Sequence, residues 1–281
     1  MTIDKPDFMN KYDIILFFFL AYSITWITLG PLALRGLGII SFESPFWLHD
    51  LGPLGPTVAA IVVLLLVSNE NALNDLYDRI TMWNVSKVWW LVAFSPIFIF
   101  IGAFLLMLLM GYQAPPISHI LDSELIRGNN YVITIIFPAL MFGIFEEIGW
   151  RGYALPRLQR KFNALTSTLI LGVLWAGWHI PALFYRYSFS DPYKIFGFWL
   201  GILMGAVLLT FLYNGSRGSV LLPMVWHVLF DIFNMLGQYF FEEVNYVQSF
   251  IVISFAVIII IVWKTEALSP SGKHSLAISQ G

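Results

Sequence analysis

The sequence predicts an all-α, polytopic membrane protein of about eight transmembrane helices, with an active site inside the helical bundle. Two observations support this prediction. Of the 281 residues, 58% are hydrophobic and only 11% are charged, with a mean hydropathy of +0.77, and no soluble domain of this size needs such values. The apolar residues also fall into runs of roughly 20 residues, which is the length that crosses a bilayer as a helix.

Eight apolar runs follow one another with short polar segments between them. The first is longer than the core of a signal peptide, so we interpret it as an uncleaved helix. The polar segment 69–87 carries apolar residues at uneven helical spacing, which suits a segment at the membrane interface. The tail after residue 263 is polar and is expected to be disordered. The predicted spans are residues 14–34, 51–67, 88–110, 131–153, 165–184, 193–213, 219–238 and 247–263.

The basic residues indicate how these spans are oriented. With both termini in the cytoplasm, ten Lys and Arg residues fall on the cytoplasmic side and four on the other side. This agrees with the positive-inside rule, whereas an odd number of spans would remove the bias. We therefore expect an integral protein of the cytoplasmic (plasma) membrane. Three regions are predicted: an N-terminal transmembrane region at 1–130, a catalytic core at 131–238, and a last helix with a polar tail at 239–281.

Composition also excludes several classes of function. Cysteine is absent, so the chain has no disulfide, no thiol nucleophile and no cysteine metal site. The net charge of −2 and the absence of a long basic run argue against a nucleic-acid partner. The expected partners are the lipid bilayer and a peptide or lipidated protein substrate.

Charged residues inside the fourth span are the strongest functional signal. An ionised group in a bilayer costs several kcal/mol, so it usually faces a polar cavity, has a partner and marks a site. Glu147 and Arg151 are four residues apart and share a helical face, whereas Glu146 is turned by roughly 100° from its neighbour. One carboxylate can thus be paired while the other stays free. The alternative is a helix end at the membrane surface, where a Glu-Arg pair only caps the helix.

Two later spans carry further polar residues. His179 lies near the end of the fifth span, and His227 and Asp231 lie four residues apart in the seventh. Asn234 is within reach of the same helical stripe. A single buried histidine is more often a packing residue, but two histidines and three carboxylates on three spans favour a site.

A carboxylate beside a neutral histidine in a low-dielectric cavity can deprotonate a water molecule. A second histidine with a polar neighbour can donate hydrogen bonds to the oxyanion that forms when that water attacks a carbonyl. The set therefore suggests intramembrane amide hydrolysis. Neither a Gly-x-Ser-x-Gly nor a His-Glu-x-x-His motif is present.

At these residues the chain resembles the CAAX prenyl endoproteases of the second type, also called the CPBP or Abi family of intramembrane proteases. The resemblance covers about residues 131–234. It rests on three motifs that occur in order on predicted spans: Glu146-Glu147-x-x-x-Arg151, Trp175-x-x-x-His179 and His227-x-x-x-Asp231.

The resemblance implies roles for these residues. Glu146 and His179 would activate water, while His227 and Asp231 would stabilise the oxyanion. Glu147 and Arg151 would orient them. Asn234, on the helical stripe of His227 and Asp231, is a further candidate for a supporting role. The substrate would be a peptide, prenylated or otherwise membrane-associated, cut near its C-terminus.

Asp231 stands where the family commonly has asparagine. An ionised aspartate cannot donate to an oxyanion, so Asp231 must be protonated, orient His227 or bind a metal. This keeps open a metalloprotease in which Glu146, His179, His227 and Asp231 bind a divalent ion such as zinc. We favour metal-independent catalysis.

Two functions outside hydrolysis remain possible. Chains of Glu, His and Asp in a membrane also serve transporters and proton relays, but the sequence shows no convincing internal repeat. Some relatives of the family are linked to bacteriocin immunity, so a non-enzymatic binding protein is the other alternative. The complete polar set argues against a loss of activity.

Overall fold

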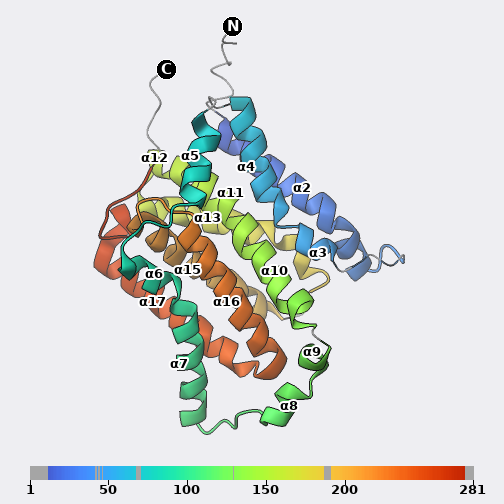
Figure 1. Cartoon of the computed structure of the whole chain (residues 1–281). Helices are drawn as coiled ribbons and strands as arrows, with labels where there is room; N and C mark the ends of the chain where they lie inside the picture. The colour runs from blue at the N-terminus through green and yellow to red at the C-terminus, as the bar shows by residue number, and fades with distance from the viewer. Residues whose placement is uncertain are drawn as a thin grey trace.

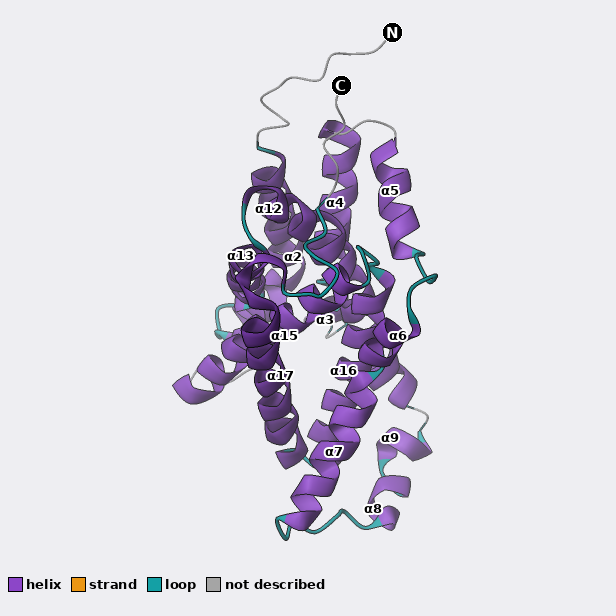
Figure 2. Cartoon of the chain, turned by 90° about the vertical axis from the view of Figure 1, so that its left-hand side faces the viewer, coloured by secondary structure: helices purple, strands orange, loops and turns teal. Residues whose placement is uncertain are grey.

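The computed structural model describes residues 12–41, 43, 45, 47–67, 71–128, 130–186 and 191–275. Regular structure in these ranges is helical, and no strand occurs among them (Figures 1 and 2). The predicted all-α fold is therefore confirmed. Lys5 and Lys11, which contributed to the charge count, and the tail after residue 275 lie outside the described residues.

The helices follow the predicted order closely. Their bounds are α2 Asp13–Gly36, α3 Leu48–Leu51, α4 Leu54–Val67, α5 Asn71–Ile80, α6 Lys87–Ala93, α7 Ser95–Leu109, α8 Ile117–Leu121, α9 Glu124–Arg127, η1 Val132–Ile136, α10 Phe137–Leu140, η2 Met141–Glu146, α11 Glu147–Gly149, η3 Trp150–Ala154, α12 Leu155–Lys161, α13 Ala164–Trp178, α14 Ile180–Leu183, α15 Pro192–Gly215, α16 Leu221–Phe240 and α17 Glu243–Ala267.

Several helices are long and apolar enough to cross a membrane, which confirms a polytopic protein. In the described chain they number five, or six if α6 and α7 form one span bent by 48°. Pro96 at the start of α7 accounts for this bend, because proline lacks the N–H that would continue the helix. The predicted count of eight is higher for two reasons. Helix α13 has only 15 residues, and α16 carries polar side chains that lower its hydropathy.

One long helix, Val132–Lys161, lies at the centre of the bundle (Figure 1). It contacts α4 on one side and α16 on the other, and α13, α15 and α17 pack against each other next to it. Its α-helical turns alternate with three π-helical turns, η1, η2 and η3. Such turns shift backbone hydrogen bonds to the fifth residue and are frequent at functional sites. The Phe145 carbonyl, in η2, accepts a hydrogen bond from the Thr57 hydroxyl of α4.

Glycine sets the closest approach between the central helix and its neighbours. A Cβ atom on Gly143 would lie 2.5 Å from the backbone nitrogen of Val228 in α16, and one on Gly149 would lie 2.4 Å from Pro56. The spacing of Gly197, Gly201 and Gly205 suggests a packing surface, but an added Cβ on any of them would have no described atom within 4 Å. These glycines therefore do not mark a close approach of helices in the described chain, because small residues permit close packing without requiring it.

The segment after α17 is ordered against the bundle, contrary to the expected disorder up to residue 275. The Gln159 amide donates to the His274 carbonyl at 2.8 Å, and the His274 backbone N–H donates to Asn214 at 3.1 Å. Burial lowers the pKa of the His274 imidazole below its usual value. At the other end of the chain, Asp13 of α2 pairs with Arg157 at 2.9 Å. Both ends of the described chain therefore contact α12.

Candidate active site

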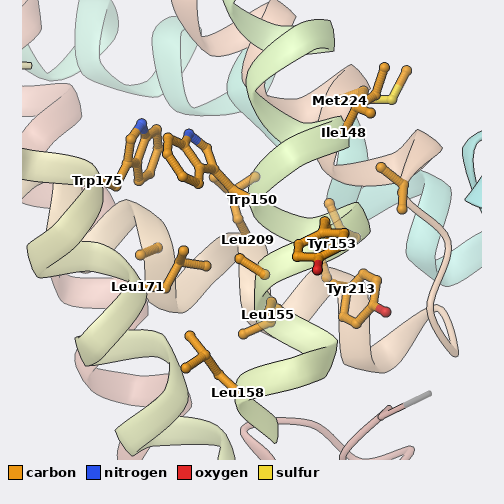
Figure 3. Close-up of a cluster of buried hydrophobic side chains, with 14 of the residues drawn as sticks. Ile148, Trp150, Tyr153, Leu155, Leu158, Leu171, Trp175, Leu209, Tyr213 and Met224 are labelled. Atoms are coloured by element: carbon orange, nitrogen blue, oxygen red, sulfur yellow. The ribbon is translucent and has the colours of Figure 1, made fainter. Parts of the chain in front are cut away.

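Glu146 is held by two tryptophans inside the bundle. Its Oε2 atom accepts a hydrogen bond from Trp150 Nε1 at 3.1 Å and another from Trp175 Nε1 of α13. Figure 3 shows the two indoles side by side with their nitrogen atoms turned the same way. The residue is only 1% exposed, and its Oε1 atom has no hydrogen-bond partner in the described part of the chain. One oxygen is thus fixed, while the other can bind a water molecule.

Glu147 joins an arginine and a histidine. Its Oε1 atom lies 2.8 Å from Arg151 Nη1 and 2.9 Å from His227 Nδ1. Both members of the Glu147–Arg151 pair are 0% exposed. The guanidinium also lies over the Trp175 ring, 4.7 Å from its centroid, a favourable cation–π geometry. Glu147 therefore fixes the position and orientation of the His227 ring.

His227 presents its second nitrogen to Asp231. The Nε2 atom lies 3.7 Å from Asp231 Oδ2, which is within ion-pair range but too long for a hydrogen bond. Because Nδ1 is bound to Glu147, a proton on Nε2 can be donated to another group in the site. The Asp231 side chain is 21% exposed, so this side of the site is the more accessible one.

His179 approaches the same site through Trp175. Its Nδ1 atom lies 2.9 Å from the Trp175 carbonyl oxygen, one helical turn earlier. A carbonyl only accepts, so Nδ1 carries a proton, and in the neutral form of the ring the lone pair is on Nε2. The ring packs against Trp178 and Phe198, at centroid distances of 4.7 and 5.4 Å. No hydrogen bond joins His179 to Glu146, although both are described; Trp175 connects them.

The structure brings most of the predicted site together. Glu146, Glu147, Arg151, His227 and Asp231 form one buried cluster, and His179 joins it through Trp175. Asn234 lies apart: its side chain accepts from Gln238 and its carbonyl from Asn245. Its predicted orienting role has no contact to support it.

Trp150 was missed by the sequence analysis, although it binds the central carboxylate. It lies four residues after Glu146, the same spacing that identified the Glu147–Arg151 pair. That spacing was a usable signal. It was overlooked because an apolar aromatic residue in a membrane helix is expected to face lipid or the core.

The donor atoms are poorly placed for a metal ion. Among the described residues, no group of three or more His, Asp or Glu side chains is arranged to bind one. Glu146 is turned toward two indole N–H groups and Glu147 toward a guanidinium. The side chains in this arrangement therefore do not fit the divalent ion that the sequence left open.

Gly143 offers a test of how closely η2 must approach α16. Gly143→Ala is expected to destabilise the protein by about 1–3 kcal/mol, because the added methyl overlaps the Val228 backbone. It should also displace His227, since Val228 adjoins it. The free energy of unfolding in detergent measures the effect on stability. Gly201→Ala, with open space around it, is the matched control and should not destabilise. Equal stability of the two variants would contradict the inferred close contact.

Buried carboxylates, histidines and an arginine brought together within a membrane bundle are consistent with one class, the intramembrane enzymes. Comparison with known proteins narrows this class by similarity. Residues 128–233 match the family model described as type II CAAX prenyl endopeptidase Rce1-like. The chain is also 24% identical over 237 residues to "CAAX prenyl protease 2" of Methanococcus maripaludis, which covers 79% of this chain and 84% of that protein. These two similarities support an intramembrane endopeptidase, whose residues 128–233 are similar to the Rce1-like type II CAAX prenyl endopeptidases.

The two similarities confirm the resemblance that the three motifs indicated. They also confirm the prediction of a protease, and they give no support to the transport or immunity alternatives.

Proposed function

We propose that this endopeptidase cuts a peptide bond near the C-terminus of a prenylated, membrane-associated peptide, with Glu146 as the general base. The observation that carries this proposal is the difference in hydrogen bonding between the two oxygens of the Glu146 carboxylate. Two indole N–H groups fix one oxygen, and the other has no partner among the described residues. A catalytic base needs this combination of fixed position and an available lone pair.

In the first step, Glu146 takes a proton from a water molecule whose oxygen attacks the carbonyl carbon of the scissile bond. His179 holds the same water by accepting a hydrogen bond at Nε2. The C–N bond of the tetrahedral intermediate then breaks. The proton on Glu146 passes to the leaving amine, which returns the carboxylate to its starting state.

His227 stabilises the negative charge on the carbonyl oxygen. As an imidazolium it donates one proton to Glu147 and directs the other, on Nε2, into the site. Asp231 keeps this ring in place from the opposite side by charge attraction. Arg151 neutralises Glu147, so that the carboxylate can hold the histidine without adding a net charge to the site.

The substrate class is inferred from the relatives. The family model and the archaeal relative are both named for prenylated CAAX sequences, in which the modified cysteine precedes the last three residues. A prenyl chain would dissolve in the bilayer and bring the peptide bond to a site within the membrane. The bilayer is therefore the second partner.

We also propose that both termini face the cytoplasm, in the cytoplasmic membrane. Asp13 and His274 both contact α12, which supports placing the two ends of the described chain on one side of the membrane, with an even number of crossings. The ten-to-four distribution of basic residues supports placing that side in the cytoplasm.

Metal removal tests the chemistry. Cleavage of a farnesylated C-terminal peptide by the purified protein in detergent is expected to continue after metal stripping, because the described side chains do not form a metal site. Product formation can be followed by mass spectrometry. Glu146→Ala supplies the inactive reference, and the same peptide without its prenyl group tests the substrate class.

Three results would overturn parts of this proposal. Activity lost on stripping and restored by a divalent ion would make the same residues a metal site. Equal cleavage of the unprenylated peptide would remove the prenyl requirement. Cleavage that persists in Glu146→Ala would exclude this residue as the base.

A further inference from the structure

A second cationic group lies beside the active site, on residues that the proposed chemistry does not use. Arg186, which follows α14, contacts His49 Nε2 in α3 through its Nη1 atom. The other nitrogen of this histidine, Nδ1, lies 2.6 Å from the Tyr185 hydroxyl. Arg186, His49 and Tyr185 are called the arginine cluster below.

The arginine cluster adjoins the catalytic elements. The His49 ring lies 5.0 Å from the ring of Phe142, which precedes Glu146 on the central helix. The Arg186 guanidinium interacts electrostatically with Asp231 and with His179. A positive charge thus borders the accessible side of the site, the side on which Asp231 is partly exposed.

The charges around the site suggest that Arg186 can bind an anionic group. With Glu147 neutralised by Arg151 and His227 as an imidazolium, Glu146 and Asp231 leave the site with one net negative charge. Arg151 is 0% exposed and paired with Glu147, so a substrate cannot reach it. Arg186 is partly exposed and is the arginine that borders the accessible side. An incoming anion would meet repulsion from the acidic groups unless this guanidinium received it.

We propose that Arg186 binds the C-terminal carboxylate of the peptide substrate and so sets the distance between the chain end and the bond that is cut. This inference rests on the proposed function and specifies its substrate: a free carboxylate close to the scissile bond. A guanidinium suits this ligand because its planar N–H groups match a carboxylate in a paired geometry.

The spacing agrees with a short C-terminal segment. Phe142 and Glu146 are four residues apart, about 6 Å along a helix, and the arginine cluster lies beyond the Phe142 ring. Seven residues of mostly helical chain separate His179 from Arg186, a rise of about 10 Å. Three residues of extended peptide span roughly 10 Å. A carboxylate at Arg186 would therefore place a bond about three residues away near the catalytic groups.

His49 and Tyr185 are positioning residues in this arrangement. An arginine N–H can only donate, so His49 accepts at Nε2 and carries its own proton on Nδ1. That proton is donated to the Tyr185 oxygen. His49 is 5% exposed, so its ring is fixed by the surrounding side chains. It can therefore fix the orientation of the guanidinium that it contacts.

The test compares two farnesylated peptides that differ only at the chain end, one with a free carboxylate and one with a C-terminal amide. The wild-type protein is expected to show a kcat/KM about 10- to 100-fold higher for the acid, the usual range for a hydrogen-bonded charge pair. In Arg186→Gln this ratio should fall to about one, and Arg186→Lys should retain part of it. Because each variant is compared with itself, partial misfolding cancels from the ratio.

Lys194→Gln is the matched control, since it removes an exposed cation from the same side of the predicted topology and should keep the full preference. Equilibrium binding of both fluorescently labelled peptides to Glu146→Gln measures the same ratio without turnover. Failure of the proposed function would appear as no cleavage of either peptide, whatever the binding ratio. Equal cleavage and binding of acid and amide by the wild type, or an unchanged preference in Arg186→Gln, would refute the carboxylate site alone.

Discussion

Replacing Glu146 by glutamine is expected to lower kcat for peptide cleavage by about 10²- to 10⁴-fold, the usual contribution of a positioned general base. The amide oxygen of glutamine can still accept from Trp150 and Trp175, so the fold should survive. What disappears is the oxygen that could accept a proton from water. Steady-state cleavage of a farnesylated peptide measures the effect.

The control for this variant is Glu243→Gln, an exposed substitution of the same kind at the start of α17. Its activity should match the wild type, and both variants should unfold at similar temperatures. A kcat for Glu146→Gln within a few-fold of the wild type would assign proton transfer to another residue, with His179 the first candidate.

The second large effect concerns stability. Glu147→Met is expected to destabilise the protein by about 3–5 kcal/mol, because it leaves the Arg151 guanidinium buried without its anion. Arginine cannot escape this cost by losing its proton. The double variant Glu147→Met/Arg151→Met should recover much of the loss, since a fully apolar pair leaves no charge uncompensated. The free energy of unfolding in detergent, measured for both variants, tests this.

An exposed pair provides the comparison. Asp122 and Arg127 also form an ion pair, but their side chains are 58% and 68% exposed. Asp122→Asn should therefore change stability by less than about 1 kcal/mol. If Glu147→Met were as mild as Asp122→Asn, the buried pair would not hold the centre of the site together.

Hydrophobic run length was sufficient to predict a helical membrane protein, because a bilayer leaves few other ways to satisfy the backbone. It was less reliable for counting spans. Helix α16 carries site residues that lower its hydropathy, and α13 is short. The segments that build the site are thus the ones that depart from the composition of a typical transmembrane helix.

Within the site, helical spacing predicted local pairs correctly. Glu147 lies against Arg151 and His227 lies near Asp231, each four residues away. Contacts between helices were beyond this reasoning. The bond from Glu147 to His227 depends on how α16 packs at Gly143, which no single-helix pattern contains. The bonds from Trp175 to Glu146 and from Arg186 to His49 likewise depend on tertiary structure.

The π-helical turns of the central helix have a consequence for insertions and deletions. A π turn closes its hydrogen bond one residue later than an α turn, so it accommodates an extra residue within a helix. Removing one residue from η2 would therefore close it into a regular α turn, and the segments on either side would keep nearly their present orientation. The same deletion in a regular α turn would rotate one side of the helix by about 100° relative to the other. The π turns are thus the positions of the central helix at which a change of one residue in length is most readily absorbed, and sequences that differ in length there can keep both the helix and the placement of Glu146.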